Sequence, residues 1–322
     1  MEKILITGGS GFIGSHFNDV LKQENIINLD LVPPKFVSKA AYVQGDIRKR
    51  EDVERAIGNN QVDMILHLAA MHHDFGIEER EYFDTNETGT QVLASAAAAH
   101  RINKFIFYSS VAVYGNVTEP TTERTATNPS NPYGASKLAG EKVLEEWAAK
   151  NNSLKLLIIR PTVVYGPRNL ANMYLLIKQI DRGLNISIGK GDNIKSIAYV
   201  ENLVAATLYL IDRFKNGTAV YNYSDEPQLP SGQIQQIIAK RLGKGPGIRV
   251  PLSLAVFMAL PFDLMITLSG KNLSISSMRV KKIATETYHQ SPKIIASGFQ
   301  NKYSTVEGIE RMIDWFKEQK RK

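Results

Sequence analysis

The sequence predicts an α/β fold, in which a doubly wound parallel sheet is joined to a smaller, mostly helical C-terminal lobe. Three observations support this prediction. An apolar run over residues 4–7 leads into a glycine cluster, residues 8–14, that opens a helical segment. Apolar runs of strand length then alternate with helical segments up to about residue 160, which is typical of parallel sheets covered by helices. This alternation weakens after about residue 165, and the chain beyond Gln228 is mostly helical in pattern.

The glycine cluster has the layout of a mononucleotide-binding turn. Gly8 permits the tight turn, Gly11 lets the backbone approach a pyrophosphate, and Gly14 lets the helix pack against the strand. The free N–H groups at the start of the helix would then face the anion. A glycine-rich pattern alone is weak evidence, but here a strand precedes it and a full βαβ unit follows. We therefore expect a dinucleotide site rather than a purely structural turn.

The second strand, over residues 26–30, ends in Asp30, 16 positions after Gly14. A carboxylate in this place suits acceptance of hydrogen bonds from the adenosine ribose hydroxyls. No arginine that could bind a 2′-phosphate follows closely, and Lys35 comes after two prolines. The pattern therefore favours NAD(H) over NADP(H), although Asp30 could also simply end a strand at the surface.

The next elements continue the sheet. Residues 41–47 predict a third strand that carries Asp46, placed to accept from the adenine amino group, and Ile47, placed to cover the ring. The fourth strand, 62–70, is nearly continuously apolar, as buried parallel strands are, and its small-residue end would let a ribose or nicotinamide approach. The other predicted elements of this half are helices over 48–58, 82–99 and 131–150 and strands over 104–110 and 154–160.

The second half predicts a discontinuous lobe. We expect a helix over 169–182, a short strand and a helix within 196–214, and a return to the sheet at 220–223. The expected division is therefore a Rossmann-like NAD-binding domain over 1–167 with a return segment at about 196–224. The substrate-binding lobe is then formed by 168–195 and 225–322.

Ser110, Tyr133 and Lys137 form the predicted catalytic set. Tyr133 and Lys137 are four positions apart, so they share one face of the predicted helix. An ammonium near a phenol favours the phenolate and lowers its pKa, so Tyr133 becomes a general acid and base near neutral pH. Ser110, at the end of the fifth strand, can hold the substrate hydroxyl or carbonyl, and Lys137 can also hold the nicotinamide ribose. The alternative is an exposed pair on a helix surface.

Several short motifs lie where this chemistry is expected. They are TGGSGFIG at 7–14, DI at 46–47, LAA at 68–70, Asn86, SSVAVYG at 109–115, NPYGASK at 131–137 and RPTVVYGP at 160–167. Together they resemble the motifs of the extended short-chain dehydrogenase/reductases, and most closely the NAD-dependent nucleotide-sugar epimerase/dehydratase family. The resemblance covers essentially the first 210 residues, and the segment from Glu307 to Trp315 is similar to that family's closing helix.

The resemblance implies a bound NAD that removes a hydride from a sugar carbon, a nucleotide-sugar substrate, and a dimer formed through helices like those expected at 82–99 and 131–150. The cofactor contacts it implies are Gly8, Gly11, Phe12, Ile13, Gly14, Asp30, Asp46, Ile47, Leu68, Ala69, Ala70, Asn86, Ser109, Tyr133, Lys137, Pro161 and Thr162.

One departure narrows the reaction. The family's 4,6-dehydratases have Thr-Asp-Glu before Val-Tyr-Gly, and this chain has Ser110, Val111 and Ala112 there. Two aliphatic side chains cannot transfer protons, so dehydration is disfavoured. We expect an epimerase that keeps its NAD and acts at C4 of the sugar, with a 4-keto-sugar reductase or dehydrogenase that exchanges NAD(P)(H) as the alternative. A hydroxysteroid-dehydrogenase-like oxidoreductase and a non-catalytic NAD-binding regulator are weaker alternatives.

The substrate side departs further from the family. Val163 stands where the family often has Asn, and Lys195 replaces its usual diphosphate-binding Arg. Lysine can meet phosphate as a point charge but not bidentately. The later Arg-x-Gly-Asp element is missing, so the substrate need not be a plain UDP-hexose. The expected substrate contacts are His72, Ser110, Tyr133, Val163, Arg168, Asn169, Asn172 and Lys195. No third ligand with helical spacing accompanies His72 and His73, so no metal site is predicted.

Composition limits the remaining possibilities. The net charge is +7, but the basic residues are scattered without a stripe interleaved with aromatics, so nucleic-acid binding is not expected. The absence of cysteine and of a visible signal peptide favours a cytoplasmic enzyme. The stretch 250–268 is strongly apolar but interrupted by Pro251, Pro261 and Asp263, so it is not a spanning helix. It predicts a helix pair packed in the small lobe or, alternatively, a hairpin that rests on a membrane.

Overall fold

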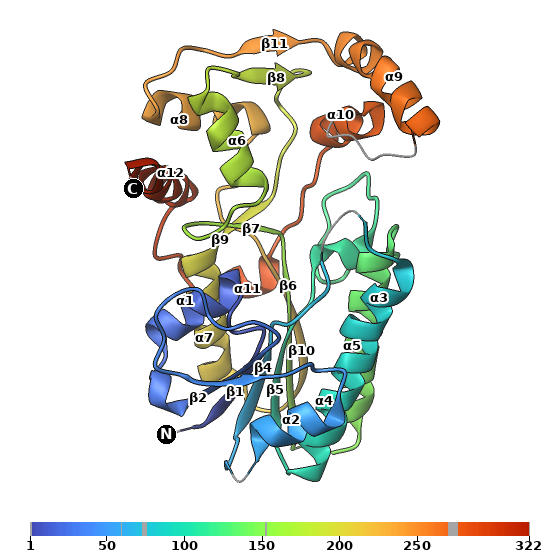
Figure 1. The fold of residues 1–322 in the computed structure, drawn as a ribbon, viewed down its shortest axis with the longest axis vertical. Helices are drawn as coiled ribbons and strands as arrows, with labels where there is room; N and C mark the ends of the chain where they lie inside the picture. The colour runs from blue at the N-terminus through green and yellow to red at the C-terminus, as the bar shows by residue number, and fades with distance from the viewer. Residues whose placement is uncertain (1, 59, 73–75, 152, 270–275, 322) are drawn as a thin grey trace.

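The computed structural model describes residues 2–58, 60–72, 76–151, 153–269 and 276–321. Within them a seven-stranded sheet has the order β10-β6-β5-β4-β1-β2-β3, with every neighbouring pair parallel (Figure 1). The strand order reverses between β1 and β4, which is where ligands bind in doubly wound sheets. The strands are β1 (Ile4–Thr7), β2 (Ile26–Asp30), β3 (Ala41–Gln44), β4 (Met64–His67), β5 (Lys104–Tyr108), β6 (Lys155–Pro161) and β10 (Gly217–Tyr223).

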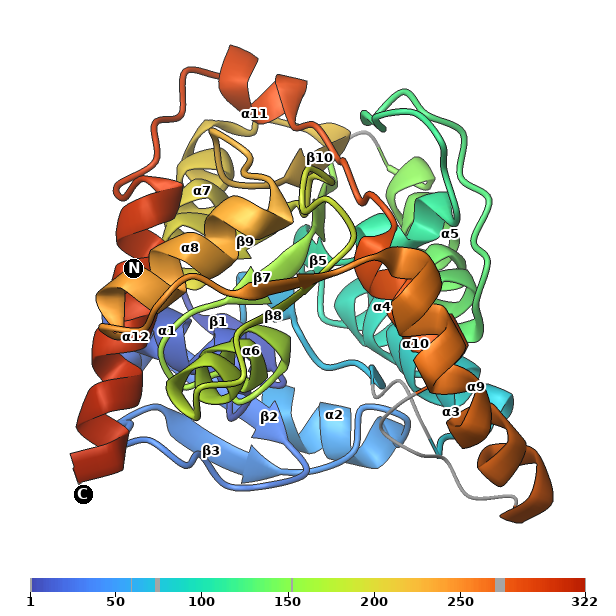
Figure 2. The same ribbon diagram turned by 90° about the horizontal axis from the view of Figure 1, so that it is seen from above.

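Helices cover both faces of this sheet, as Figures 1 and 2 show together. On one face α2, α4 and α5 enclose a core that includes Leu93, Phe105 and Trp147. On the other, α1 and α7 enclose a core with Phe17 and Tyr108. Burial on both faces explains why the central strands are apolar along their length. The helices that accompany the sheet are α1 (Phe12–Val20), α2 (Arg50–Ile57), α3 (Glu79–Phe83), α4 (Gly89–Ala99), α5 (Pro132–Ala149), α7 (Val200–Arg213) and α11 (Pro292–Ala296).

The C-terminal lobe has its own core, in which α6, α8 and α12 pack around Ile177, Ile238 and Ile313. Two small parallel sheets belong to this part of the chain, β7 with β9 and β8 with β11. Helices α9 and α10 pack against each other at the upper end of Figure 1. The bounds are β7 (Val163–Tyr165), α6 (Asn172–Asp181), β8 (Ile186–Ile188), β9 (Ile197–Tyr199), α8 (Ser231–Arg241), β11 (Ile248–Val250), α9 (Leu252–Ser269), α10 (Ser277–Ala284) and α12 (Thr305–Arg321).

The predicted α/β architecture is confirmed, with changes at element ends. The strand expected over 62–70 is shorter, because β4 ends at His67, and the helix expected over 82–99 begins at Glu79 and contains a π-helical turn, η2 (Asp84–Thr88). The segment 220–223 returns to the sheet within β10, which pairs with β6. The sequence did not predict β7, β8 or β11, which are three residues long and pair with distant segments of the chain. The domain boundary at residue 167 stays a prediction.

The expectation of a helix pair within 250–268 is wrong. A single helix, α9, runs through Pro261, and its partner is α10. Proline removes one intrahelical hydrogen bond, but here the turns on either side continue the same helix. No helix in the described ranges is long and apolar enough to cross a membrane.

Candidate active site

The glycine turn joins β1 to α1 at the carboxyl edge of the sheet. Gly8 has a φ of +73°, and a Cβ there would lie 2.6 Å from the backbone nitrogen of Ala69. A Cβ on Gly14 would lie 2.5 Å from the Cα of Gly9, so the helix can approach the turn only with glycine at this position. At Gly11 a Cβ would meet only the carbonyl oxygen of Gly8, at 3.2 Å. The turn is therefore closed on the protein side at Gly8 and Gly14 and open at Gly11, as a phosphate cradle requires.

Gly9 and Asn28 also build this turn, although the sequence prediction gave neither of them a role. A Cβ on Gly9 would overlap the side-chain oxygen of Asn28. Asn28 is buried in β2, and its amide donates a 3.0 Å hydrogen bond to the hydroxyl of Ser10. The available signal was the single polar residue inside the otherwise apolar strand 26–29.

Asp30 lies beside the glycine turn, as expected for a ribose ligand. One carboxylate oxygen accepts from the backbone N–H of Ser10 at 3.0 Å and the other from that of Val32 at 3.2 Å. These bonds fix the carboxylate at the end of β2, next to the phosphate cradle. Its contact with the ribose stays a prediction.

Asp46 and Ile47 lie beyond β3, whose last residue is Gln44. Asp46 forms an ion pair with Arg48 at 2.6 Å. Burial opposes ionisation of Asp46, but the hydrogen bonds and charge of Arg48 outweigh it, so the pKa of Asp46 lies below its usual range. The buried Ile47 packs against Gly89, where a Cβ would lie 2.7 Å from the Ile47 Cδ1. The adenine contacts of both residues stay predictions.

Asn86 holds the segment after β4 in place. It is fully buried in the π-helical turn, where its Oδ1 accepts from the Met71 N–H at 2.9 Å. Its Nδ2 donates to the Met71 carbonyl at 3.0 Å and to the Ser136 hydroxyl at 2.9 Å. These bonds tie the predicted nicotinamide-facing residues Leu68, Ala69 and Ala70 to α5. Asn86 therefore acts here as a positioning residue, and its direct contact with the cofactor stays a prediction.

Tyr133 and Lys137 lie on the first turns of α5. Asn131 caps this helix by accepting from the Gly134 N–H at 2.8 Å. Tyr133 is half-buried, and its ring centroid lies 6.4 Å from that of Tyr82. Lys137 is 1% exposed, and its Nζ lies 4.1 Å from the centroid of the Phe107 ring. Burial lowers the pKa of Lys137 to about 7, and the charge of Glu141 opposes this fall.

Ser110 lies at the start of a 3₁₀ helix, η3 (Val111–Tyr114), that packs against α5. Its hydroxyl accepts from the Ala112 N–H at 3.1 Å. Gly134 makes the close approach possible, because a Cβ there would overlap the carbonyl oxygen of Ala112. The fold therefore brings the segment that carries Ser110 against the turn that carries Tyr133. Tyr133 and Lys137 are not an exposed pair on the surface of α5, because Lys137 is buried.

Two buried hydroxyls test whether this edge fits a cofactor. The hydroxyls of Ser109 and Thr162 are buried and have no hydrogen-bond partner in the described part of the chain. They follow β5 and β6, beside the buried Pro161. Buried polar atoms are normally paired, so these two suit a ligand with polar atoms that occupies the carboxyl edge. Together with the cradle at Gly11, they fit a dinucleotide, and both belong to the predicted contact set.

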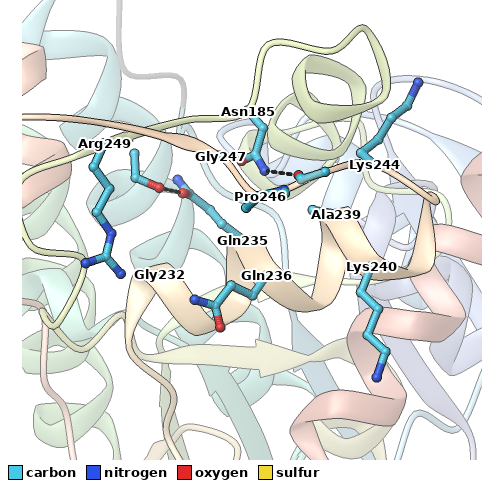
Figure 3. Close-up of a pocket in the computed structure, with 12 residues that line it drawn as sticks. Asn185, Gly232, Gln235, Gln236, Ala239, Lys240, Lys244, Pro246, Gly247 and Arg249 are labelled. Atoms are coloured by element: carbon cyan, nitrogen blue, oxygen red, sulfur yellow. Dashed lines mark hydrogen bonds between the residues drawn. The ribbon is translucent and has the colours of Figure 1, made fainter.

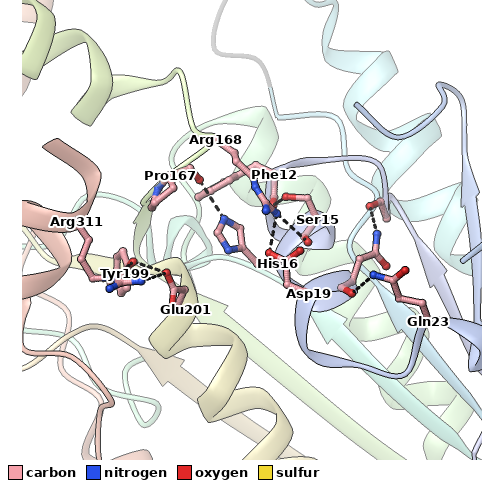
Figure 4. A network of polar contacts seen from close by, with 12 residues as sticks. Phe12, Ser15, His16, Asp19, Gln23, Pro167, Arg168, Tyr199, Glu201 and Arg311 are labelled. Carbon is pink, nitrogen blue, oxygen red and sulfur yellow. Dashed lines mark hydrogen bonds and ion pairs between the residues drawn. The ribbon is translucent and has the colours of Figure 1, made fainter. Parts of the chain in front are cut away.

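On the substrate side, Arg168 and Asn169 are held by the protein itself. Arg168 has a φ of +74° and donates to the Ser15 carbonyl at 3.1 Å and to Asp19 at 2.8 Å, both on α1 (Figure 4). Asn169 donates to the Val164 carbonyl at 2.9 Å. Substrate contacts by Arg168 and Asn169 stay predictions. Arg168 links its segment to α1, and Asn169 links the same segment to β7.

The other expected substrate residues are spread over several segments. Asn172 is exposed at the start of α6, Val163 is half exposed in β7, and the exposed His72 follows β4. The Lys195 ammonium donates to the Thr285 carbonyl, so it lies beside the segment that follows α10. These four residues lie in four separate segments of the chain, and their contacts with a substrate stay predictions. His73 and Asp74 lie outside the described residues.

A separate pocket of about 360 Å³ lies between α8 and the β8–β11 pair (Figure 3). Its lining includes Lys240, Lys244 and Arg249, and none of the predicted site residues. It belongs to the C-terminal lobe rather than to the glycine turn and α5.

Known proteins match this chain over most of its length. The model of the NAD dependent epimerase/dehydratase family matches residues 4–223. An N-acetyl-alpha-D-glucosaminyl-diphospho-ditrans,octacis-undecaprenol 4-epimerase from Escherichia coli O157:H7 is 35% identical over 317 residues, which cover 98% of this chain and 95% of that protein. A UDP-glucose 4-epimerase from Vibrio cholerae is 31% identical over 258 residues, which cover 76% of each protein.

Solved structures agree in fold. A UDP-glucose 4-epimerase from Thermus thermophilus in complex with NAD has a TM-score of 0.76 and 24% identity, with 98% of this chain and 99% of that chain covered. A dTDP-glucose 4,6-dehydratase from Bacillus anthracis str. Ames in complex with NAD also has a TM-score of 0.76, at 21% identity, with 100% and 98% covered. Because these structures are less than 25% identical to this chain, the comparison shows that the fold is shared.

Proposed function

Because the chain belongs to the NAD-dependent epimerase/dehydratase family, we propose that it is a C4 epimerase of a sugar joined to its carrier through a diphosphate. The enzyme is NAD-dependent, as its family is. The observation that carries the proposal is that Ser110, Tyr133 and Lys137 are combined with the aliphatic Val111 and Ala112. Ser110, Tyr133 and Lys137 supply the hydrogen bond and the acid–base group that oxidation and reduction of a sugar hydroxyl need. Val111 and Ala112 have no group that could act as the acid or base of a dehydration.

The residues of this chain would divide the reaction as follows. NAD, when bound, would accept a hydride from the sugar carbon and give it back. Tyr133 takes the hydroxyl proton as the hydride leaves C4, and it returns that proton when the hydride comes back to the opposite face. The Lys137 ammonium favours the phenolate of Tyr133. Ser110 holds the C4 oxygen by a hydrogen bond. The keto sugar can then turn over between hydride removal and hydride return while it stays bound.

Two kinds of carrier join a sugar through a diphosphate, a nucleotide and a polyprenyl lipid. A nucleotide is the carrier that the motifs imply. A polyprenyl diphosphate is favoured by the relative that matches nearly full length, which is named for an undecaprenol-linked sugar. Val163 and Lys195 differ from the residues that nucleotide-sugar members of the family usually have, which supports a carrier other than a plain nucleotide. The Lys195 ammonium can meet the diphosphate of either carrier as a point charge. We propose the polyprenyl-linked N-acetylhexosamine as the preferred substrate.

A product assay with matched variants tests the activity. NAD-loaded enzyme is incubated with UDP-N-acetylglucosamine and, separately, with polyprenyl-diphospho-N-acetylglucosamine, and the sugar products are separated. Tyr133→Phe should lower the rate at least about 100-fold while NAD stays bound. Tyr174→Phe, a tyrosine of α6 that packs against Trp315 and Phe316, is the control and should keep the wild-type rate. Turnover retained in Tyr133→Phe would exclude the proposed role.

A 4-keto-sugar reductase is the second candidate, because it would use the same three residues. The two differ in how they hold NAD. An epimerase should purify with NAD that does not exchange during turnover, whereas a reductase should release it each cycle. Native mass spectrometry of the purified protein, before and after turnover with isotopically labelled NAD in solution, separates these outcomes.

We propose further that the enzyme works in the cytoplasm as a homodimer. Helix α5 packs beside α4 on one face of the sheet, which supports a paired-helix interface with a second copy. Light scattering coupled to size-exclusion chromatography measures the mass directly. A mass of one chain of 35.9 kDa at micromolar concentration would contradict the dimer.

A further inference from the structure

Helix α9 is apolar around its whole circumference. Its only polar residues are Ser253, Asp263, Thr267 and Ser269. A helix of this kind is normally buried in a protein core or in lipid. Here it lies at one end of the molecule and packs mainly against α10 (Figures 1 and 2).

One face of α9 is exposed. Phe257 is 70% exposed, Met258 61% and Met265 55%, and Leu254 and Pro261 are exposed beside them. At 100° per residue these five positions fall within one third of the helix circumference, so they form a single stripe. We call these five residues the α9 stripe. Contiguous exposed apolar surfaces mark interaction sites in soluble proteins.

The opposite side of α9 faces the protein. Ala259 is 1% exposed on that side. Asp263, the only acidic residue of the helix, also lies there and accepts a 3.0 Å hydrogen bond from the backbone N–H of Ser277, at the start of α10. The α9 stripe is therefore free of acidic groups, and the one carboxylate in the helix is used to hold α10.

The surroundings of the stripe are basic. The sequence from 249 to 282, which contains α9 and α10, has five basic residues and one acidic residue, and that acidic residue is Asp263, which is bonded to α10. Arg249, before α9, and Lys281, in α10, are exposed. An apolar face with a basic rim matches the interface of a bilayer that contains anionic lipids. Two copies of this surface would bring like charges together, so a second copy of the chain fits less well.

The stripe is also connected to the substrate side. The segment after α10 runs beside Lys195, since the Thr287 N–H donates to the Ile194 carbonyl and the Thr287 carbonyl accepts from Ser196, both at 3.0 Å. One residue further, the Tyr288 carbonyl accepts from the Thr121 N–H at 3.1 Å. A surface that bound a membrane through α9 would thus hold the bilayer beside the segment that carries Lys195.

We propose that the α9 stripe inserts into the interfacial layer of an anionic membrane, with α9 lying in the membrane plane and the neighbouring lysine and arginine side chains on the lipid headgroups. The sugar of a lipid-linked substrate would then reach the carboxyl edge of the sheet while its lipid stays in the bilayer. That consequence rests on the proposed function. The binding itself needs neither NAD nor turnover, so it can hold or fail independently.

Vesicle co-sedimentation of the full-length, NAD-loaded protein tests the proposal. The vesicles are phosphatidylcholine alone or with about 30% phosphatidylglycerol. Binding should require the anionic lipid and should weaken as salt rises, because the basic rim is screened. Phe257→Ser with Met258→Ser should lower the partition coefficient at least about tenfold. The matched control, Leu175→Ser with Leu184→Ser, changes two apolar residues that are each 55% exposed elsewhere and should bind as the wild type does.

Three results would overturn the proposal. They are absence of wild-type binding to anionic vesicles at low salt, equal binding by the stripe variant, and conversion of a dimer to a monomer by the stripe variant when the wild type binds no vesicles. The last would assign the stripe to a second copy. Circular dichroism and NAD content confirm that each variant is folded. Turnover of a soluble nucleotide sugar by the stripe variant reports on the epimerase assignment separately.

Discussion

Lys137 is a charged side chain in a place where burial favours its neutral form. It is 1% exposed, and burial lowers its pKa from the usual 10.5 to about 7. Burial, and to a smaller extent the nearby Lys137 charge, hold the pKa of His67 well below its usual range. A fall of the size seen for Lys137 corresponds to a cost on the order of 5 kcal/mol for keeping the ammonium charged. Burial of this charge therefore lowers the stability of the NAD-free protein, a cost of the kind that functional sites often carry.

Replacing Lys137 should therefore separate stability from activity. Lys137→Met removes the buried charge, so the NAD-free protein should gain roughly 2–4 kcal/mol in the free energy of unfolding at pH 6, while turnover is lost. Because the folded pKa of about 7 lies below the unfolded value of 10.5, the wild type becomes more stable as pH rises from 7 to 10.5. The gain in the variant should accordingly shrink over that window.

Urea unfolding at pH 6 and at pH 9.5 measures both effects. Lys142→Met, on the same helix but exposed, is the matched control and should change stability by less than about 0.5 kcal/mol at either pH. A Lys137→Met protein that is less stable than the wild type at pH 6 would contradict the inferred cost of burial.

Helix α5 and strand β6 are joined by a buried ion pair. Arg160 donates to Glu141 through two nitrogens, at 2.9 and 2.5 Å, and both side chains are almost fully buried. Arg160 also donates to the Tyr114 hydroxyl at 2.9 Å, which links η3 to the same network. Arg160 therefore connects the helix that carries Tyr133 to the 3₁₀ helix that follows Ser110.

Breaking this pair should be costly, and removing it entirely should be much less so. Arg160→Met leaves Glu141 buried and unpaired, so the free energy of unfolding should fall by about 3–5 kcal/mol. Arg160→Met combined with Glu141→Leu removes both charges and should recover most of that loss. Thermal and urea unfolding of the two single variants and the double variant give the comparison. A double variant as unstable as Arg160→Met would mean that the network acts through hydrogen bonds to Tyr114 rather than through charge.

Elements with a long apolar pattern could be predicted from the sequence. β1, β2 and β5 are buried on both faces, so their composition alone indicated strands. β7, β8 and β11 pair with segments far along the chain, and their three residues carry no periodic signal. The π-helical turn around Asn86 was not predicted either, and the side chain of Asn86 bonds to Met71 and Ser136, which lie in other segments.

At the scale of the whole molecule, the two halves of the site differ in how far the sequence could define them. The predicted cofactor contacts follow largely from short motifs, and the constraint on Gly14 comes from Gly9 within the same motif, whereas that on Gly8 comes from Ala69 after β4. The substrate half depends on how the lobe packs. Arg168, expected to face the substrate, donates to Ser15 and Asp19 on α1. Likewise the apolar composition of α9 was evident in the sequence, but the face that it leaves exposed was not.

The most direct test follows the hydrogen on C4. NAD-loaded enzyme is given N-acetylglucosamine deuterated at C4 and linked either to UDP or to a polyprenyl diphosphate, and the product is examined by NMR and mass spectrometry. Hydride removal and return within one active site predicts a C4-inverted sugar that keeps its deuterium at C4, with the C6 hydroxyl intact. Loss of the deuterium to solvent or to free NAD, or a product without its C6 hydroxyl, would contradict C4 epimerisation by Tyr133, Lys137 and Ser110.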